Sequence, residues 1–596
     1  MRKIILSSIV ALGSLSLFAQ SNTQYINTFV GSIKMGHTFP GACVPHGIVQ
    51  LSPDTDTIAH NINGVYQTDV YKYCAGYQYS DSTIVGFSHT HLSGTGHSDL
   101  GDILIMPFTG EVQFNPGTSD NPDSGYRSRF DHSTESSQAG YYAVTLSDDD
   151  IKAELTATSR VGVHRYSYPS GATPKILLDL THGIYNYDGK VLWSQLRVEN
   201  DTLLTGYRIT NGWSRTNYTY FAISLSKPIV SYGADDRKST KYNGWWRKFD
   251  ISKGFPEMGA PKLVAFFEFE DDGKPLELKV ALSAVSTNGA LANLEAEALN
   301  HTFDYLVADA HNRWAEEIDI IEVEGSDEKK TMLYTSLYHT LINPSEYMDV
   351  TGEYRGVDHN IHKSNDFVNY TIFSLWDTYR TLHPLYTLLN RERNSDIVES
   401  MLSHHDQSVH KALPIWSHMG NENWCMIGYH GVSVVGDMAI KDDNSIDKKR
   451  ALDAMINSSN VGYYDGIDFY KENGYVPYEI NSSGSSITLE YAYDDWVIYY
   501  LASKIGDTHT SQQYKERAYN YKNVYDKSIG FARARLSNGQ WKEDVNLLNT
   551  HWQGFIEGNS WNYSFYVPHD VNGMIELMGG DERFVSRLDS LFTMEL

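Results

Sequence analysis

The chain has 596 residues, which at about 150 residues per domain is too long for a single core and predicts between two and four structural units. Its 74 Asp and Glu residues outnumber its 48 Lys and Arg residues, so the formal net charge is −26 and its field repels polyanions. The charge therefore argues against a nucleic-acid partner or an anionic membrane surface, whereas an aromatic content of 13% is compatible with rings that stack on sugars.

Residues 1–19 are expected to form a secretion signal peptide. Arg2 and Lys3 precede an apolar run that ends at the small residue Ala19. The run is too short to span a membrane, and no later stretch of about 20 apolar residues follows it. We therefore expect an exported, soluble protein without membrane insertion, either periplasmic or extracellular.

The three cysteines, Cys43, Cys74 and Cys425, allow at most one disulfide bond. The fold must therefore depend on packing rather than on cross-links. A bond between Cys43 and Cys74 is one possibility that the sequence leaves open.

Apolar periodicity divides the rest of the chain into three parts. Residues 22–290 contain short alternating runs separated by Gly, Pro, Asn and Asp, which predicts a β-sandwich whose last strand is Leu276–Leu282. Residues 291–325 are rich in Ala, Leu and Glu and are expected to form a helical linker. Over residues 326–596 the apolar spacing changes toward 3.6, which favours a toroid of helical hairpins.

The glycine-rich loop from Gly86 to Asp99 holds His89, His91 and His97. These side chains and Asp99 could ligate a metal such as zinc, but loop histidines serve more often as hydrogen-bonding groups. We favour a sugar or interdomain contact for the loop, with His91 as its candidate substrate ligand.

Trp376, Asp377 and Arg380 lie at a predicted helix start. Trp376 could stack on a sugar ring while Asp377 accepts hydrogen bonds from two adjacent hydroxyls; alternatively, Asp377 and Arg380 form only a surface ion pair. His430 could line a pocket or pack between helices. The carboxylates of Glu490 and Asp494 suit the positive end of a helix dipole, so they are assigned mainly to structure and kept as minor candidates.

Glu557 is the strongest candidate for a catalytic acid. It follows Phe555 within residues 551–561, and Trp552 and Trp561 are nearby in the sequence. Such neighbours are expected to exclude water and raise the pKa of the carboxyl group, as proton donation to a departing sugar oxygen requires. A structural glutamate at a turn is the alternative. The HExxH, GxxxxGK[ST] and GxSxG signatures do not occur in the chain.

Taken together, these segments resemble the glycoside hydrolase family 92 α-mannosidases along the whole mature chain. The resemblance is carried by Gly86 to Asp99 with Gly101 to Leu104, by Phe373 to Pro384, by Leu413 to Trp416, by Leu489 to Trp496, and by Glu557 to Trp561 with Val567 to Asp570. It implies an N-terminal β-sandwich, a helical linker and an (α/α)6 barrel, with the site between the two main domains. It also implies an exported, calcium-dependent, exo-acting enzyme that inverts the anomeric centre of a mannose-containing glycan.

By this resemblance Glu557 matches the general acid, and Asp377 belongs to a motif that holds the terminal mannose. The further substrate-binding candidates are Trp376, Arg380, His91, His430 and Trp561. An acid at position 557 implies that the bond joins two sugars, because a sugar leaving group needs a proton whereas a phosphate would leave without one. We expect this bond to be α-1,2.

Family members continue beyond Leu596, so the general-base Asp and much of the calcium site are expected there, and the barrel over 326–596 is expected to be incomplete. Two alternatives remain: a non-catalytic mannan-binding protein, and a polysaccharide lyase on a similar toroid. The acidic charge argues against the lyase, whose substrates are themselves acidic.

Overall fold

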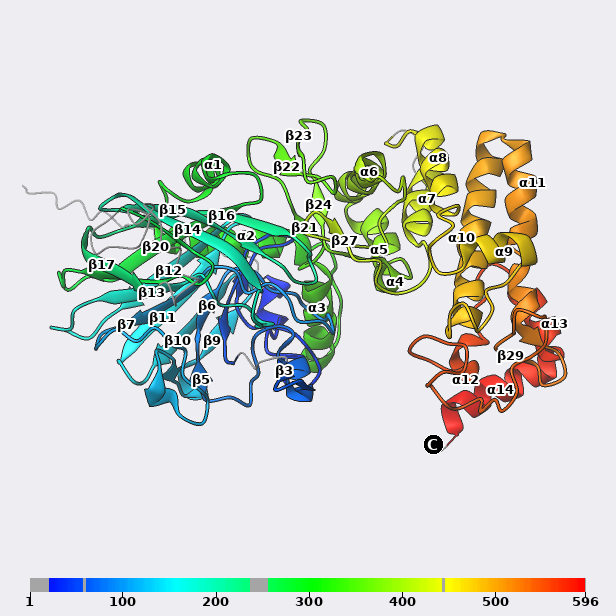
Figure 1. Ribbon diagram of the computed structural model, residues 1–596, viewed down its shortest axis with the longest axis horizontal. Helices are drawn as coiled ribbons and strands as arrows, with labels where there is room; N and C mark the ends of the chain where they lie inside the picture. Colours follow the sequence, from blue (N-terminus) through cyan, green and yellow to red (C-terminus); the bar gives the residue numbers. More distant parts are fainter. Residues whose placement is uncertain (1–20, 57–60, 236–255, 442–444, 595–596) are drawn as a thin grey trace, which may run out of the picture.

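The computed structural model describes residues 21–56, 61–235, 256–441 and 445–594, and it shows a strand-rich half followed by a helical half (Figure 1). The expected signal peptide, residues 1–19, lies outside the described residues. No helix in the described part of the chain is both long enough and apolar enough to cross a membrane.

Two antiparallel sheets make up the strand-rich half. The nine-stranded sheet has the order β18-β14-β15-β16-β20-β12-β11-β10-β9, and the seven-stranded sheet has the order β1-β2-β6-β7-β13-β19-β17. The strands of the first are β9 (Ser136–Gln138), β10 (Tyr141–Leu146), β11 (Ile151–Ala157), β12 (Val161–Ser167), β14 (Val191–Asn200), β15 (Leu203–Thr210), β16 (Asn217–Leu225), β18 (Glu257–Ala260) and β20 (Leu276–Ser283). Those of the second are β1 (Ala42–Cys43), β2 (Gln50–Asp54), β6 (Gly86–Ser88), β7 (Leu104–Phe108), β13 (Lys175–Asp179), β17 (Ile229–Asp235) and β19 (Val264–Phe269).

Apolar side chains from both sheets form the sandwich core. Ile105 and Phe267 come from the seven-stranded sheet, Leu155 and Phe221 come from the nine-stranded sheet, and all four are fully buried in one cluster. Burial of a side chain of this size stabilises the fold by roughly 1.5–3 kcal/mol. The alternating pattern read from the sequence therefore marks the inward face of each strand.

Three capped helices connect the sandwich to the helical half. They are α1 (Thr287–Glu297), α2 (Phe303–Ile318) and α3 (Asp327–Thr340). Each begins after a Ser or Thr whose side chain accepts a hydrogen bond from a backbone N–H of the first turn: Ser286, Thr302 and Ser326. Trp314 of α2 donates from Nε1 to the backbone oxygen of Cys43 at 2.7 Å, which ties this helix to the first strand of the sandwich.

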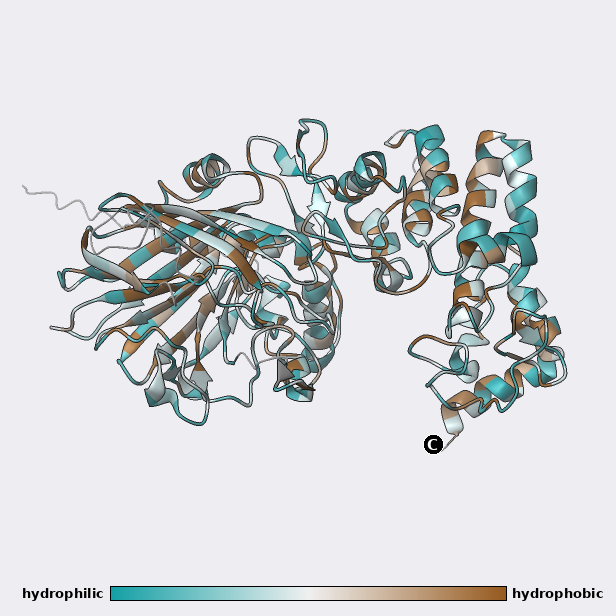
Figure 2. Ribbon diagram, in the orientation of Figure 1, coloured by the Kyte–Doolittle hydropathy of each residue, from teal (hydrophilic) through white to brown (hydrophobic). Residues whose placement is uncertain are grey.

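The helical half is a row of helix pairs that stays open over the described residues (Figure 1). Its helices are α4 (Leu375–Thr378), α5 (Leu382–Leu389), α6 (Arg391–Gln407), α7 (Gly431–Lys441), α8 (Lys448–Ser458), α9 (Ile467–Asn473), α10 (Gly484–Ile505), α11 (Thr508–Arg517), α12 (Ser560–Tyr563), α13 (Val571–Met578) and α14 (Asp581–Thr593). Hydrophobic residues concentrate along α10, and α11, which lies beside it, is largely hydrophilic (Figure 2). The predicted fold class, an N-terminal β-sandwich with helices after it, is confirmed.

Short strands complete the chain. Two-stranded pairs are β3 (Asn61–Ile62) with β4 (Val65–Tyr66), β5 (Thr83–Ile84) with β8 (Ser128–Arg129), β21 (Ser345–Glu346) with β24 (Tyr370–Thr371), β22 (Glu353–Arg355) with β23 (Ile361–Lys363), and β28 (Tyr525–Asp526) with β29 (Phe531–Ala532). A three-stranded sheet contains β25 (Phe373–Ser374), β26 (Trp416–His418) and β27 (Asn421–Glu422).

The three-stranded sheet joins the two halves. Asn421 donates to Ser214 Oγ at 2.8 Å, and His418 Nε2 lies 3.3 Å from the buried carboxylate of Asp99. The rings of Trp213 and Trp416 lie 4.2 Å apart, centroid to centroid. Hydrogen bonds, charge and aromatic packing therefore hold the sandwich loops against β26 and β27, and β26 pairs with β25, the strand that leads into α4.

All three cysteines are free thiols. Cys43 lies 3.6 Å from the hydroxyl of Tyr338, and Cys74 lies 3.4 Å from the hydroxyl of Ser98. The disulfide bond between Cys43 and Cys74 that the sequence leaves open is therefore not formed.

Candidate active site

A hollow with about 840 Å³ of empty space lies between the two halves. The sandwich contributes Ser93, Gly94 and Thr95 to its lining, and the helical half contributes Asp377 and Thr378 among others. The glycine-rich loop singled out in the sequence thus faces the segment that contains Asp377.

Asp377 reaches this hollow because a strand turns directly into a short helix. Phe373 and Ser374 of β25 pair with β26, and α4 begins at the next residue, with Leu375 buried in the core. The side chain of Asp377 is exposed, and the Ser374 hydroxyl donates to its carboxylate. The carboxylate is therefore both accessible and oriented.

Glu490 of α10 accepts a hydrogen bond from Trp376 and forms an ion pair with Arg380. Trp376 donates from Nε1 to Glu490 Oε1 at 3.1 Å, and Arg380 Nη2 lies 3.3 Å from the same oxygen. The Arg380 guanidinium also lies over the ring of Trp376, 5.3 Å from its centroid. Arg380 is thus paired with Glu490, and the surface ion pair between Asp377 and Arg380 considered from the sequence is not the contact that forms.

Glu557 lies in the loop that precedes α12. Its φ of +42° is in the left-handed region, which non-glycine residues rarely adopt. Partial burial raises the pKa of its carboxyl group, and the negative charge of Asp377 raises it further. The two carboxyl groups therefore interact through their charges.

The surroundings of Glu557 differ from those expected from the sequence. Its side chain is exposed rather than enclosed by the two nearby tryptophans. The side chain of Trp552 is 71% exposed, and the ring of Trp561 packs against Phe531 with 4.9 Å between centroids. The direction of the pKa shift is as predicted, but Asp377, distant in sequence, contributes to it, and the tryptophan shielding predicted from local sequence is wrong.

A tyrosine from the sandwich also interacts with Glu557. The pKa of Tyr71 is raised by burial, then by Cys74 and by the charge of Glu557. A Cβ atom at Gly96 would lie 2.3 Å from the Tyr71 hydroxyl, so the glycine-rich loop makes room for this side chain. Both halves of the molecule therefore contribute groups around Glu557.

His430 is buried in the helical half and does not line the hollow. It is 1% exposed, its Nδ1 lies 3.0 Å from Asp494, its Nε2 bonds to Glu490, and its ring stacks on Tyr379 at 3.9 Å. Burial lowers the pKa of His430, but the charges of Asp494 and Glu490 outweigh burial and raise the pKa to about 9. His430 is therefore a buried cation at neutral pH, and its assignment as a direct substrate ligand is corrected to a supporting position.

His91 is also removed from any sugar. Its side chain is fully buried, its Nδ1 lies 2.6 Å from the backbone oxygen of Gln50, and its Nε2 lies 2.9 Å from Asp54, which also contacts His182 at 2.7 Å. Both ring nitrogens therefore have hydrogen-bond partners inside the sandwich. The prediction that His91 binds substrate is therefore wrong, because its ring presents no surface to the hollow, whereas Ser93 to Thr95 of the same loop do.

The described residues do not assemble a metal site. No group of three or more His, Cys, Asp and Glu side chains within them is placed to hold a metal ion. Calcium takes six to eight oxygen ligands, and Asp377 in the hollow offers only two. Among the described residues that line the hollow, Asp377 is the one carboxylate, so a calcium ion there would need most of its oxygens from other groups.

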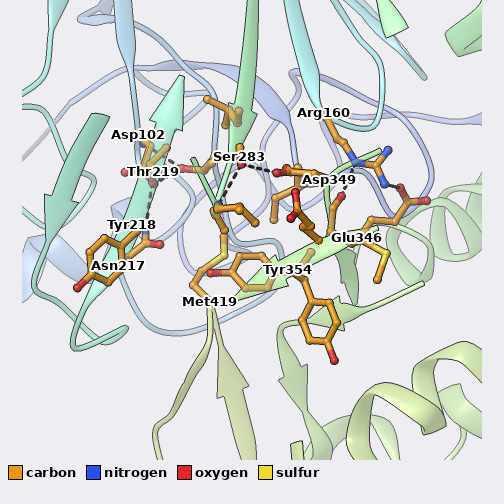
Figure 3. Close-up of a pocket in the computed structure, with 18 residues that line it drawn as sticks. Asp102, Arg160, Asn217, Tyr218, Thr219, Ser283, Glu346, Asp349, Tyr354 and Met419 are labelled. Atoms are coloured by element: carbon orange, nitrogen blue, oxygen red, sulfur yellow. Dashed lines mark hydrogen bonds and ion pairs between the residues drawn. The ribbon is translucent and has the colours of Figure 1, made fainter. Parts of the chain in front are cut away.

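A second cavity, with about 460 Å³ of empty space, lies between the sandwich and residues 346–354, which follow α3 (Figure 3). Its charged groups are already paired: Arg160 lies 2.6 Å from Glu297 and 3.1 Å from Glu346, and Asp349 accepts from Ser283 at 2.7 Å. Asp377 lines the interdomain hollow and not this cavity, so the interdomain hollow is the candidate active site.

Sequence reasoning missed Ser485 and Ser486 and underrated Glu490. Ser486 and Glu490 are fully buried polar residues of α10, and they are four residues apart, so they lie on one face of that helix. That spacing of buried polar groups was the available signal.

Comparison with known proteins follows the same division of the chain. A model of the glycosyl hydrolase family 92 N-terminal domain matches residues 25–283, and a model of the family 92 catalytic domain matches residues 289–596. A family GH92 α-mannosidase from Bacteroides thetaiotaomicron, also solved in complex with mannoimidazole, is 40% identical with a TM-score of 0.89, and the match covers 97% of this chain and 76% of that one.

Two further relatives extend the comparison. A family GH92 inverting mannosidase from Bacteroides thetaiotaomicron VPI-5482 is 28% identical with a TM-score of 0.81, covering 96% of this chain and 74% of that one. A protein of Arthroderma benhamiae described as an uncharacterized secreted glycosidase is 24% identical, covering 95% of this chain and 73% of that protein.

Proposed function

The chain belongs to glycosyl hydrolase family 92, and from that premise we propose that it is an exo-acting α-mannosidase that hydrolyses terminal α-1,2-mannosidic bonds of glycans with inversion. Support comes from the relatives: one is an α-mannosidase with a mannoimidazole complex, and another is an inverting mannosidase. The predicted signal peptide and the secreted relative support an exported protein, periplasmic or extracellular.

Glu557 is proposed as the general acid. The observation that carries this assignment is that its carboxyl group has a raised pKa, due in part to the charge of Asp377, which lines the hollow shared by both halves. A raised pKa keeps the acid protonated at higher pH, so that it can protonate the oxygen of the departing sugar.

Asp377 is proposed to hold the mannose whose bond is cleaved. Its exposed carboxylate can accept hydrogen bonds from two adjacent ring hydroxyls, while the half-buried ring of Trp376 offers an apolar face to the sugar. Arg380 lies over that ring and fixes its orientation. Trp561, which packs against Phe531, is not assigned a contact with the sugar.

Calcium dependence is part of the proposal because the sequence resembles a calcium-dependent family. The described residues do not form a complete calcium site, and no step above runs through a metal. A chelator tests this point independently of the acid.

The experiment follows mannose release from α-1,2-, α-1,3- and α-1,6-mannobiose by proton NMR, with calcium and with chelator. We expect β-mannose to be released first from the α-1,2 substrate, and Glu557→Gln to slow release about 10²- to 10⁴-fold. Glu543→Gln, an exposed glutamate in the same long loop, is the matched control and should keep wild-type activity.

Other outcomes select other functions. α-Mannose as the first product would refute inversion. Binding of mannan without release of mannose would select the mannan-binding protein, and an unsaturated product that absorbs ultraviolet light would select the lyase.

A further inference from the structure

We propose that Glu490 is a positioning residue that sets two segments at a fixed distance from each other: the acid loop, residues 551–559 before α12, and the sugar-binding segment, residues 374–380. The proposal rests on the proposed function, because it deepens the roles of Glu557 and Asp377. It is carried by hydrogen bonds that join α10 to both segments.

The N-terminus of α10 holds the backbone of the acid loop. Ser485 and Ser486 donate from their backbone N–H groups to the oxygen of Gly554 at 3.0 and 3.1 Å. The Ser486 hydroxyl accepts from the backbone N–H of Ile556 at 3.1 Å. The last of these contacts is to Ile556, the residue before Glu557. The first residues of α10 therefore fix the backbone from which the Glu557 side chain projects.

One turn further along α10, Glu490 holds the sugar-binding segment. Its Oε1 accepts from Trp376 Nε1 at 3.1 Å and lies 3.3 Å from Arg380 Nη2. The same oxygen accepts from the hydroxyl of Tyr563 at 3.4 Å, and Tyr563 belongs to α12, which directly follows the acid loop. One carboxylate thus connects the segment that carries Asp377 to the helix that follows the loop of Glu557.

A carboxylate is the group this position requires. Glu490 is fully buried, and all of its partners donate: Trp376, Arg380 and Tyr563 to one oxygen, and His430 to the other. A glutamine of the same size would turn an N–H₂ group toward donors on one side, which leaves buried donors unpaired. The two cations, Arg380 and His430, would also lose the anion that compensates them.

Loss of Glu490 leaves the reacting groups chemically intact. Glu557 and Asp377 keep their carboxyl groups, but Trp376 and Arg380 are free to turn and α12 loses its contact with them. Because a displacement of about 1 Å at a reacting centre can cost about 10²-fold in rate, Glu490→Gln is expected to lower kcat about 100-fold. We also expect mannose to bind at least about tenfold more weakly, since Trp376 lies in the sugar-binding segment.

The control is a glutamate with the same kind of partners in the sandwich. Glu154 is 6% exposed, lies 2.9 Å from Arg165 Nη2 and accepts from Tyr141 at 2.8 Å. Glu154→Gln should lose thermal stability without a change in kcat or KM of the folded protein. If Glu490 were only structural, the two variants would behave alike.

The experiment measures kcat and KM on α-1,2-mannobiose, mannose binding by calorimetry, and the melting temperature, for wild type, Glu490→Gln and Glu154→Gln. Should Glu490→Gln fail to fold, Tyr563→Phe removes a single donor from the carboxylate, and we expect kcat to fall about threefold. Equal kcat, KM and mannose affinity in the wild type and in the folded Glu490 or Tyr563 variant would overturn the proposal.

The design also separates failure of the inference from failure of the proposed function. A wild-type protein that binds mannose without hydrolysing mannobiose would refute the function. Weaker mannose binding by Glu490→Gln than by Glu154→Gln would then still support the positioning role, and equal binding would refute it.

Discussion

Replacement of Arg517 by Met should destabilise the helical half strongly. Arg517 ends α11, and its guanidinium pairs with Asp495 of α10 through Nε to Oδ2 at 3.0 Å and Nη2 to Oδ1 at 3.0 Å. Asp495 is fully buried and also accepts from the hydroxyls of Tyr429 and Tyr470, each at 2.8 Å. Met keeps most of the apolar stem but leaves this carboxylate without a cation.

The expected loss is about 3–5 kcal/mol in the free energy of unfolding at pH 7, because one partner of a buried ion pair is removed. Burial raises the pKa of Asp495 and Arg517 opposes that rise, so the pKa increases further in Arg517→Met. A carboxyl group with a raised folded pKa loses stability as pH rises, so the defect should shrink on acidification. Urea denaturation followed by circular dichroism at 222 nm reports on the helical half.

Two further variants decide whether the reasoning is right. Arg197→Met breaks pairs with Glu199 and Glu257 in which Arg197 is 55% exposed, and should cost no more than about 1 kcal/mol. Adding Asp495→Asn to Arg517→Met should restore part of the loss, because no buried charge then remains. Equal effects of Arg517→Met and Arg197→Met, or a defect that grows on acidification, would refute the argument.

Three other predictions concern the site and its surroundings. Asp377→Asn removes a negative charge that raises the pKa of Glu557, so the alkaline limb of kcat/KM should move to lower pH; a pH–rate profile in which the limb stays or moves upward would contradict this. A thiol reagent should titrate at most one cysteine in the native protein, the half-buried Cys425, and three in denaturant without a reductant, and fewer than three would indicate a disulfide bond. His91→Gln should lower stability by about 1–3 kcal/mol through the buried hydrogen bonds it loses while KM stays unchanged, and a higher KM with intact stability would restore His91 as a ligand.

The elements of this fold were predictable because their apolar residues repeat with clear periods. Leu276–Leu282 was predicted as the last strand of the sandwich, and β20 spans Leu276–Ser283. Ile397 and Met401, four residues apart, were expected on one helical face, and both are fully buried in α6. Period and local composition were sufficient here because the residues of each buried face recur at a fixed spacing within one short segment.

The arrangement of the candidate site was less predictable because it depends on contacts between distant segments. Trp376 and its acceptor Glu490 are 114 residues apart, and nothing local to either residue marks the other. The orientation of His91 is decided by Gln50 and Asp54 on a neighbouring strand, so a loop that reads as polar and exposed turns its histidine inward. The neighbours of Glu557 in sequence were likewise poor guides, since Asp377 affects its pKa and the ring of Trp552 faces solvent.

Buried charge along α10 has a geometric consequence. Glu490, Asp494 and Asp495 are all fully buried on this one helix, and their cations come from other segments: Arg380, His430 and Arg517. Buried ion pairs stabilise no better than well-packed apolar groups, because desolvation offsets most of the attraction. Apolar contacts alone, however, would let a helix slide or rotate against its neighbours at little cost, whereas a carboxylate displaced from its cation leaves two buried charges unpaired. The three pairs therefore fix the register of α10 against its neighbours: Glu490 pairs with the segment that carries Asp377, and the two aspartates pair with the residue before α7 and the end of α11. A helix fixed in this way is a rigid support for the segment that carries Asp377.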